Sequence, residues 1–391
     1  GVRGLAARLA VSERHLHRSL VAEVGVGPLA LARTRRAQTA RLLVDQTPLP
    51  LSEVAFAAGF ASIRQFNDVM RAEFGCAPSL LRRSPSATAE GGRAAGGGLV
   101  LRLVHREPFA APHLLAFLAA RAVPGLESAG DAGYRRVVRT PHGPGLFAAT
   151  PVPGAGHVVV RLHLPDLADL ATVVARVRRL LDLDADPAAV DPALAADPAL
   201  APLVAARPGL RVPGAVDGFE LAVRAVLGQQ VSVAGARTLA GRLVAALGEP
   251  LSAVPTEEGA AGLTHAFPTA TEVATADLGA LGLTTARRRA LQALAAEVAE
   301  GRLSLDPGAD RAQTRTRLLA LPGIGPWTAE YAALRALADP DAWPGTDLVL
   351  RRRVAARGAD PDRWRPWRGY GAVHLWADAA TADPTTTKET P

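Results

Sequence analysis

Residues 318–350, LLALPGIGPWTAEYAALRALADPDAWPGTDLVL, constrain the fold of this chain more than any other stretch. Gly323 and Gly325 allow a sharp turn with close backbone approach, and Pro326 suits the first position of a helix. We expect a helix, a tight turn, a second helix, and then a loop that delivers Asp347 to a third helix. Free amides at the start of the second helix form an anion site suited to a nucleic-acid phosphate. A carboxylate on a loop is a candidate reactive group.

The size and the cysteine count bound the class of protein. At 391 residues the chain is too long for one ordinary core, so we expect two or three domains. There is no apolar run long enough to span a bilayer and no visible secretory signal, so we expect a cytoplasmic protein with no membrane partner. The single Cys76 excludes an internal disulfide, a four-cysteine zinc site and an iron–sulfur cluster held by this chain's own thiolates. We expect no metal and no required cofactor.

Positive charge is concentrated at the amino end. Residues 1–84 hold twelve Arg and six acidic residues, a net charge of +6 out of +7 for the whole chain. This location predicts contact with nucleic-acid phosphates. Genome composition is an equally good explanation of why Lys388 is the only lysine.

Two helix-turn-helix patterns repeat in this basic segment, at residues 5–20 and 51–74. Ser12 and Ser62 are expected to cap the second helix of each unit. Two-helix hairpins are common, but the repeat, the polar outward faces and the local charge together favour DNA binding. The apolar positions expected to pack the helices of the first unit are Leu5, Leu9, Val11, Leu16 and Leu20.

Two such units, joined by an Arg-rich helix over residues 33–43, resemble the AraC-type DNA-binding module. The resemblance implies that the second helix of each unit enters the major groove of promoter DNA. The chain starts at Gly1 directly on the first helix, and fusions of this type resemble the Ada-AlkA architecture, so we expect further sequence upstream. The residues expected to contact DNA are Ser12, Arg14, His15, Arg18, Ser62, Arg64, Gln65 and Asn67.

The next segments read as a linker and a small α+β domain. Residues 84–98 are expected to be a flexible linker because of their Gly, Ser and Ala content. Residues 99–206 predict a small antiparallel sheet with helices on one face. Strands are expected at 99–104, 134–138, 146–151 and 158–164, and helices at 112–123 and 167–181.

Helical periodicity then dominates, so the fold class is mainly α with a small α+β domain. We expect an AraC-type double helix-turn-helix at residues 1–83, the antiparallel-sheet domain at 99–206, an all-α bundle at 207–380, and a disordered tail at 381–391. Helices of the bundle are expected at 219–226, 233–247, 271–281, 285–300, 313–321, 327–338 and 347–357.

Ordered motifs in the second half resemble the helix-hairpin-helix DNA glycosylases, and most of all the AlkA-type 3-methyladenine DNA glycosylase II. They are RPGLRVPG at 207–214, VRAVLGQQVSVAGA at 223–236, FPT at 267–269, the hairpin, and WRGYGAVHLW at 367–376. The resemblance implies hydrolytic removal of alkylated bases from double-stranded DNA in base excision repair. The run LLAFLAARAVPG at 114–125 resembles the amino-terminal domain of these enzymes, which implies that Phe117 lines the base pocket.

The chemistry needs a flipped base, aromatic faces and one carboxylate. An alkylated purine with a positive charge stacks well on aromatic rings. Trp327, Tyr331 and Trp376 match pocket positions of the family, with core packing as the alternative. Asp347 would stabilise the oxocarbenium-like sugar and orient water, with helix capping as the alternative. A cationic base leaves without a second, protonated carboxyl group.

The resemblance also assigns the backbone grip and the wedge. Gly323, Ile324, Gly325 and Thr328 would hold a phosphate, and the hairpin carbonyls would hold a possible monovalent cation. The wedge that fills the vacated stack would be Gln230, where the family can present an apolar residue. Bifunctional relatives place a Schiff-base lysine just after the hairpin, where this chain has tryptophan, so we expect no lyase activity.

Two other functions stay open. The chain could be an Ada-like transcription regulator whose glycosylase-like domain senses damaged DNA without catalysis. The intact hairpin, Trp327 and Asp347 favour the enzyme. An adenine-mismatch glycosylase is disfavoured by the missing cluster cysteines, and an oxidised-guanine glycosylase by the missing lysine.

Overall fold

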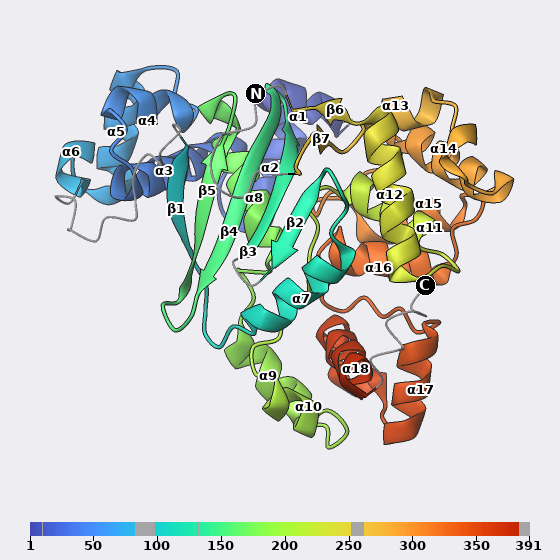
Figure 1. The fold of residues 1–391 in the computed structure, drawn as a ribbon. Helices are drawn as coiled ribbons and strands as arrows, with labels where there is room; N and C mark the ends of the chain where they lie inside the picture. The colour runs from blue at the N-terminus through green and yellow to red at the C-terminus, as the bar shows by residue number, and fades with distance from the viewer. Residues whose placement is uncertain (10, 83–97, 131–132, 252–261, 383–391) are drawn as a thin grey trace. The chain divides into compact units, whose positions relative to one another are not determined.

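The computed structural model describes residues 1–9, 11–82, 98–130, 133–251 and 262–382 (Figure 1). The chain divides into two compact units, Gly1–Leu101 with Leu164–Thr172, and Arg102–His163 with Val173–Pro391. The predicted linker, except Gly98, and the predicted tail beyond residue 382 lie outside the described residues. Within those residues, the structure contains no helix with both the length and the apolar character needed to cross a membrane.

The first unit is built from two short helix pairs and a longer helix between them. Ser12 and Ser62 begin the second helix of each pair, where their hydroxyls accept from the amides of His15 and Gln65. The helices are α1 (Val2–Arg8), α2 (Glu13–Val24), α3 (Pro28–Gln46), α4 (Leu51–Ala57), α5 (Ile63–Phe74) and α6 (Pro78–Leu81). This arrangement is a double helix-turn-helix, as the repeat predicts.

The core of the first unit lies mostly between α3, α4 and α5, where Leu43, Val54 and Phe66 are fully buried. The predicted packing of α1 is partly wrong, because Leu5 and Leu9 are 42% and 54% exposed. Helix α1 has only seven residues, and among its described side chains the small one of Ala6, 3% exposed, is the buried one. Leu16, predicted to pack here, is buried.

A five-stranded sheet has the order β1-β5-β4-β3-β2. The strands are β1 (Leu99–Val104), β2 (Glu127–Gly130), β3 (Gly133–Thr140), β4 (Gly143–Val152) and β5 (His157–His163). The pairs β2–β3, β3–β4 and β4–β5 are antiparallel. Strand β2 was not predicted. It lies at the edge of the sheet and pairs with β3, for example Glu127 with Arg136.

The rest of the second unit is mainly helical. Its helices are α7 (Ala111–Arg121), α8 (Leu170–Leu180), α9 (Pro187–Ala195), α10 (Ala201–Ala206), α11 (Gly218–Leu227), α12 (Val233–Leu247), α13 (Ala270–Thr275), α14 (Thr285–Ala299), α15 (Arg311–Leu319), α16 (Pro326–Arg335), α17 (Leu348–Arg357) and α18 (Arg368–Ala382). The helix predicted at 271–281 is broken into α13 and a short 3-10 turn at Gly279–Leu281. A two-residue ribbon, β6 (Glu249–Pro250) with β7 (His265–Ala266), interrupts the predicted all-α bundle.

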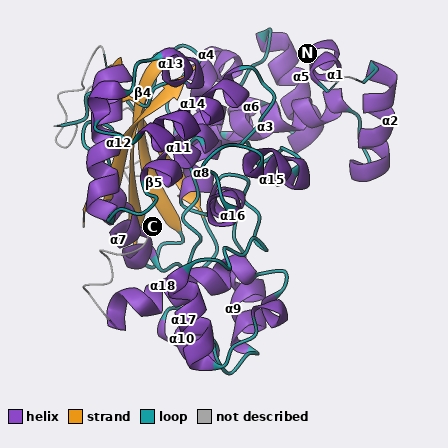
Figure 2. Ribbon diagram, turned by 90° about the vertical axis from the view of Figure 1, so that its right-hand side faces the viewer, coloured by secondary structure: helices purple, strands orange, loops and turns teal. Residues whose placement is uncertain are grey.

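Two large hydrophobic cores form within the described part of these helices, and α16 contributes side chains to both. One core joins α11, α12 and α14 to the sheet, and it takes Ala329 and Ala332 from α16. The other surrounds α9, α10, α17 and α18, and it takes Ala333 and Leu334 from α16. Figure 2 shows α9, α10, α17 and α18 as one group below α16. Tyr331 of α16 packs against a smaller third cluster, formed by Ala215, Leu221 and Ala336.

Candidate active site

The predicted helix-hairpin-helix is formed by α15, residues 320–325 and α16. Gly323 has φ +75°, a left-handed conformation that favours glycine, and a Cβ there would lie 3.0 Å from Ala290 Cβ. Gly325 caps α16, and Pro326 is its first residue. Within the described chain, the amides of Gly323 and Gly325 have no acceptor. These two amides are free to donate to an anion.

The other two predicted hairpin residues serve differently. The side chains of Ile324 and Thr328 are 5% and 2% exposed, so neither side chain lies open to solvent. The Ile324 amide donates to Leu321 O at 3.3 Å. Thr328 Oγ1 accepts from the Gln229 side chain at 3.1 Å.

The loop between α11 and α12 carries the predicted wedge. Gln230 is exposed and has φ +56°, a left-handed conformation that is uncommon for a residue with a side chain. Next to it, Gln229 Nε2 donates to Gly323 O at 2.9 Å. Arg287 donates to the Gln229 carbonyl from α14. Gln229 thus ties the loop both to the hairpin and to α14.

Asp347 begins α17 and contacts one of the predicted pocket residues. Its Oδ1 accepts from the Leu350 amide at 2.9 Å, and its Oδ2 accepts from Trp327 Nε1 at 2.9 Å. Asp347 is 1% exposed, so the protein closes its carboxylate to solvent. The predicted cap is therefore present, and the carboxylate also lies against the predicted indole.

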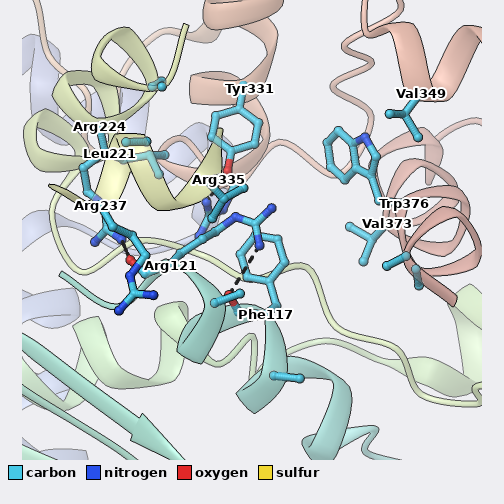
Figure 3. A pocket seen from close by; sticks show the side chains of 18 of the residues that line it. Phe117, Arg121, Leu221, Arg224, Arg237, Tyr331, Arg335, Val349, Val373 and Trp376 are labelled. Atoms are coloured by element: carbon cyan, nitrogen blue, oxygen red, sulfur yellow. Dashed lines mark hydrogen bonds between the residues drawn. The ribbon is translucent and has the colours of Figure 1, made fainter. Parts of the chain in front are cut away.

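A cavity of about 360 Å³ brings the four predicted aromatic residues together. Trp327 and Tyr331 stack with ring centroids 4.8 Å apart and an interplanar angle of 15°. Trp376 meets Tyr331 edge-on, with centroids 6.3 Å apart. Phe117 enters from α7 (Figure 3). A cavity of this size, lined by aromatic rings, is suited to a nucleobase.

Guanidinium groups, which were not predicted, form the other part of the wall. Arg121 and Arg335 lie over the Phe117 ring, with their guanidinium carbons 3.9 Å and 4.9 Å from its centroid. Arg335 also lies 5.2 Å from the Tyr331 centroid and donates to the Tyr331 hydroxyl (Figure 3). Burial would raise the pKa of Tyr331, but the charges of Arg335 and Arg121 lower it overall. Phe117 and Tyr331 therefore already carry cations on their faces.

Arg224 is another arginine that lines the cavity, and it belongs to a buried ion network. Glu127 accepts from Arg224 at 3.0 Å and from Arg136 at 3.1 Å, and Glu220 also pairs with both arginines. Burial would raise the pKa of Glu127, but Arg224 and Arg136 together lower it to about 2. The network joins β2 and β3 to α11, and it fixes Arg224 at the cavity.

One sequence signal could have found two of these arginines. Phe117 and Arg121 are four residues apart on α7, and Tyr331 and Arg335 are four residues apart on α16. Residues at this spacing share one helix face, so an aromatic residue that enters a pocket brings the arginine with it.

The predicted DNA contacts of the first unit lie on α2 and α5 or at their starts. Ser12 and Ser62 cap these helices through their hydroxyls. Gln65 accepts from the Ala61 amide at 3.1 Å. The remaining predicted residues are Arg14, His15, Arg18 and Arg64, which are exposed, and Asn67, which is half-buried. Within the described residues, no group of three His, Cys, Asp or Glu side chains could hold a metal ion.

Comparison with known proteins gives family matches in both units. The family model of the AlkA N-terminal domain matches residues 100–217, and that of a helix-turn-helix domain matches residues 5–84. A protein of Mycobacterium tuberculosis described as a probable bifunctional transcriptional activator/DNA repair enzyme AlkA is 50% identical over 385 residues, 96% of this chain and 76% of that protein. DNA-3-methyladenine glycosylase 2 of Escherichia coli is 37% identical over 275 residues, 67% of this chain and 92% of the relative.

A solved structure shares the fold over most of this chain. The 3-methyladenine DNA-glycosylase of Archaeoglobus fulgidus superposes with a TM-score of 0.60 at 20% identity, covering 70% of this chain and 96% of that one.

Proposed function

We propose, because this chain belongs to the AlkA family of DNA repair glycosylases joined to a helix-turn-helix activator module, that it hydrolyses the glycosidic bond of 3-methyladenine-type alkylated bases. The chain is a DNA repair glycosylase with an attached DNA-binding regulator. We further propose that it acts on alkylated bases, has no lyase activity and binds promoter DNA. The observation that carries the proposal is the Trp327–Asp347 hydrogen bond beside an aromatic cavity.

The cavity would receive the flipped base. Leaving the duplex costs a few kcal/mol, and stacking recovers about 1–3 kcal/mol per aromatic face. Because Phe117 and Tyr331 already carry arginines, the two tryptophan faces are the better partners for a cationic base. Trp327 and Trp376 are therefore expected to hold the alkylated ring.

Asp347 would act on the sugar beside this base. As C1′–N breaks, its carboxylate stabilises the positive charge on the sugar and orients the water that attacks C1′. The protein closes the Asp347 carboxylate to solvent. To contact the sugar, Asp347 would therefore have to release Trp327 Nε1 or accept from it while also facing the sugar.

The backbone grip would come from the free amides of Gly323 and Gly325. The Gly323 carbonyl accepts one hydrogen bond from Gln229, which leaves it a second lone pair for a monovalent cation at the hairpin. Gln230 would fill the vacated stack. No cofactor is needed for this hydrolysis.

The first experiment compares the wild-type chain with Asp347→Asn on duplex DNA treated with dimethyl sulfate. We expect the wild type to release 3-methyladenine and Asp347→Asn to release it on the order of 10²–10³ times more slowly. Equal release would remove Asp347 from the mechanism. Tight binding of methylated DNA by the wild type without any release would instead favour the damaged-DNA sensor.

A second experiment addresses lyase activity. The position after the hairpin is Trp327, and Lys388 is the only lysine of the chain. We expect an intact abasic strand after base release and no covalent complex on borohydride reduction. A trapped protein–DNA adduct would contradict monofunctional chemistry.

A further inference from the structure

Arg121 differs from Arg335 and Arg224, two other guanidinium groups of the cavity, in how its donors are used. Its Nη1 donates a long hydrogen bond, 3.5 Å, to Phe117 O, and its side chain also interacts with the Tyr331 hydroxyl. It makes no ion pair within the described part of the chain. Yet it lines the cavity and covers the Phe117 ring (Figure 3). A guanidinium has five N–H donors, so Arg121 brings a positive charge without a carboxylate partner, and further N–H groups, to the space where a base would lie.

Arg335 and Arg224 have their donors or their charge taken up by other groups. Arg335 donates to Pro213 O, Gly214 O and the Tyr331 hydroxyl, one bond from each nitrogen. The charge of Arg224 is balanced by Glu127 and Glu220 in the buried ion network.

An uncompensated guanidinium in this cavity has opposite effects on two classes of lesion. A base that is already cationic is repelled by it and needs no help in leaving. A neutral base must take the electron pair of the C1′–N bond as it leaves, and a nearby cation that donates hydrogen bonds stabilises the resulting anion. A guanidinium fork also suits the carbonyl and ring-nitrogen acceptors of a purine edge.

We propose that Arg121 is a leaving-group residue that extends base excision from cationic lesions to neutral ones. This inference rests on the proposed function. The C1′–N bond breaks with its electron pair passing to the base, Arg121 donates to an acceptor of that base, and water adds its oxygen to C1′. One proton of the water ends on the departed base, so the products are a neutral free base and an abasic sugar.

The charge state of Arg121 is compatible with this role. Burial lowers its pKa to about 10, with Tyr331 opposing the change and Arg335 adding to it. A group with that pKa remains protonated at the neutral pH of the reaction. Phe117 fixes the guanidinium in place by the cation–π contact, so little ordering is needed when the base arrives.

The test measures single-turnover release of hypoxanthine, a neutral base with a carbonyl oxygen, and of 3-methyladenine, which is cationic in DNA. We expect Arg121→Met to lower the hypoxanthine rate on the order of 10- to 100-fold and to leave the 3-methyladenine rate unchanged or higher. Arg121→Lys retains the charge without the fork, so it should restore part of the hypoxanthine rate.

Arg237→Met is the matched control. Arg237 lines the same cavity and makes no ion pair within the described residues, but its Nε donates to Ala122 O. We expect this variant to leave the ratio of the two rates unchanged. An equal effect of Arg237→Met on that ratio would overturn the assignment to Arg121.

The remaining outcomes are also decisive. Equal losses of both activities in Arg121→Met would make Arg121 structural, and no loss of either would remove it from the reaction. A wild type that releases 3-methyladenine but no hypoxanthine would overturn this inference alone. A wild type that releases neither base would instead overturn the proposed function.

Discussion

The Gln229 side chain donates a 2.9 Å hydrogen bond to the carbonyl oxygen of Gly323, which lies 94 residues later in the sequence. A second bond from the same nitrogen reaches Thr328 Oγ1 at 3.1 Å. One amide group thus joins the loop that presents Gln230 to the hairpin that would hold a phosphate. The wedge and the backbone grip are fixed at one distance from each other.

Gln229→Ala is expected to reduce base release from duplex DNA by about tenfold, because two hydrogen bonds that position the loop are lost. The rate should recover when the lesion lies in a single-stranded segment, where no stack has to be filled. Single-turnover rates on the two substrates measure this difference. The same loss on both substrates would mean that Gln229 does not act through the wedge.

Asp347→Asn and Asp347→Ala are expected to separate capping from catalysis. The carboxamide oxygen of asparagine can still accept from the Leu350 amide, but its NH2 group then faces Trp327 Nε1–H, so the unfolding free energy should fall by about 1–3 kcal/mol. Alanine loses the cap as well, at a further cost of about 1 kcal/mol. Both variants should lose base release to a similar degree. All five tryptophans lie in the second unit, so their fluorescence in a urea titration reports the stability of that unit.

Glu127 is expected to make the second unit sensitive to acid. Its pKa is lowered from 4.5 to about 2, so its contribution is fully present above pH 4.5 and is lost as the pH falls toward 2. Glu127→Gln should flatten the dependence of the unfolding free energy on pH in that window. It should also cost about 3–5 kcal/mol at neutral pH, because Arg136 and Arg224 lose a buried partner. An unchanged slope between pH 4.5 and 2 would contradict the assignment.

Asp182 is expected to act with the opposite sign. Burial raises its pKa from 3.8 to about 6, although Tyr370 and the Val212 amide donate to it. Its contribution is therefore present below pH 3.8 and is lost as the pH rises through 6. Both donors bind Oδ2, so Asp182→Asn can keep them and should stabilise the second unit at pH 7.5 by on the order of 1–3 kcal/mol. Urea titrations at pH 4 and pH 7.5 compare the two.

Arg64→Ala is expected to weaken promoter binding by the first unit. The Arg64 side chain is 94% exposed on α5, and its 4.0 Å approach to Asp68 is too long to hold it. Removing one phosphate contact should lower the slope of log affinity against log salt by about 1. Arg33→Ala is the matched control, because Arg33 is paired with Glu73 at 3.2 Å. Base release from a short duplex should be the same in both variants.

Local signals explain why most helices could be predicted. Asp217, Ser232 and Thr284 each cap the helix that follows, and the apolar periodicity behind each of them is clear. Strand β2, with the sequence ESAG, has no alternating pattern, and its pairing with β3 exists only in the folded sheet. The exposure of Leu5 and Leu9 likewise depends on which side chain of α1 faces the module, and periodicity does not decide that.

The site divides in the same way. The sequence resemblance pointed to Trp327, Tyr331, Trp376 and Asp347, and the structure brings them together. The arginines that line the cavity were not predicted from the sequence, because an arginine is expected at the surface unless a buried partner is known. Arg224 makes the reason plain: its partner Glu127 lies 97 residues earlier, on the strand that the pattern did not reveal.

Gln230 is held in a left-handed backbone next to Gln229, which is anchored twice, by its side chain to the hairpin and by its carbonyl to Arg287 of α14. Such a loop needs no rearrangement before it presses on a duplex, so its ordering entropy is spent during folding and not at the encounter with DNA. We expect the Gln230 side chain to open weakened base pairs more readily than intact ones during the search for damage. Only bases that have already left the stack would then enter the cavity.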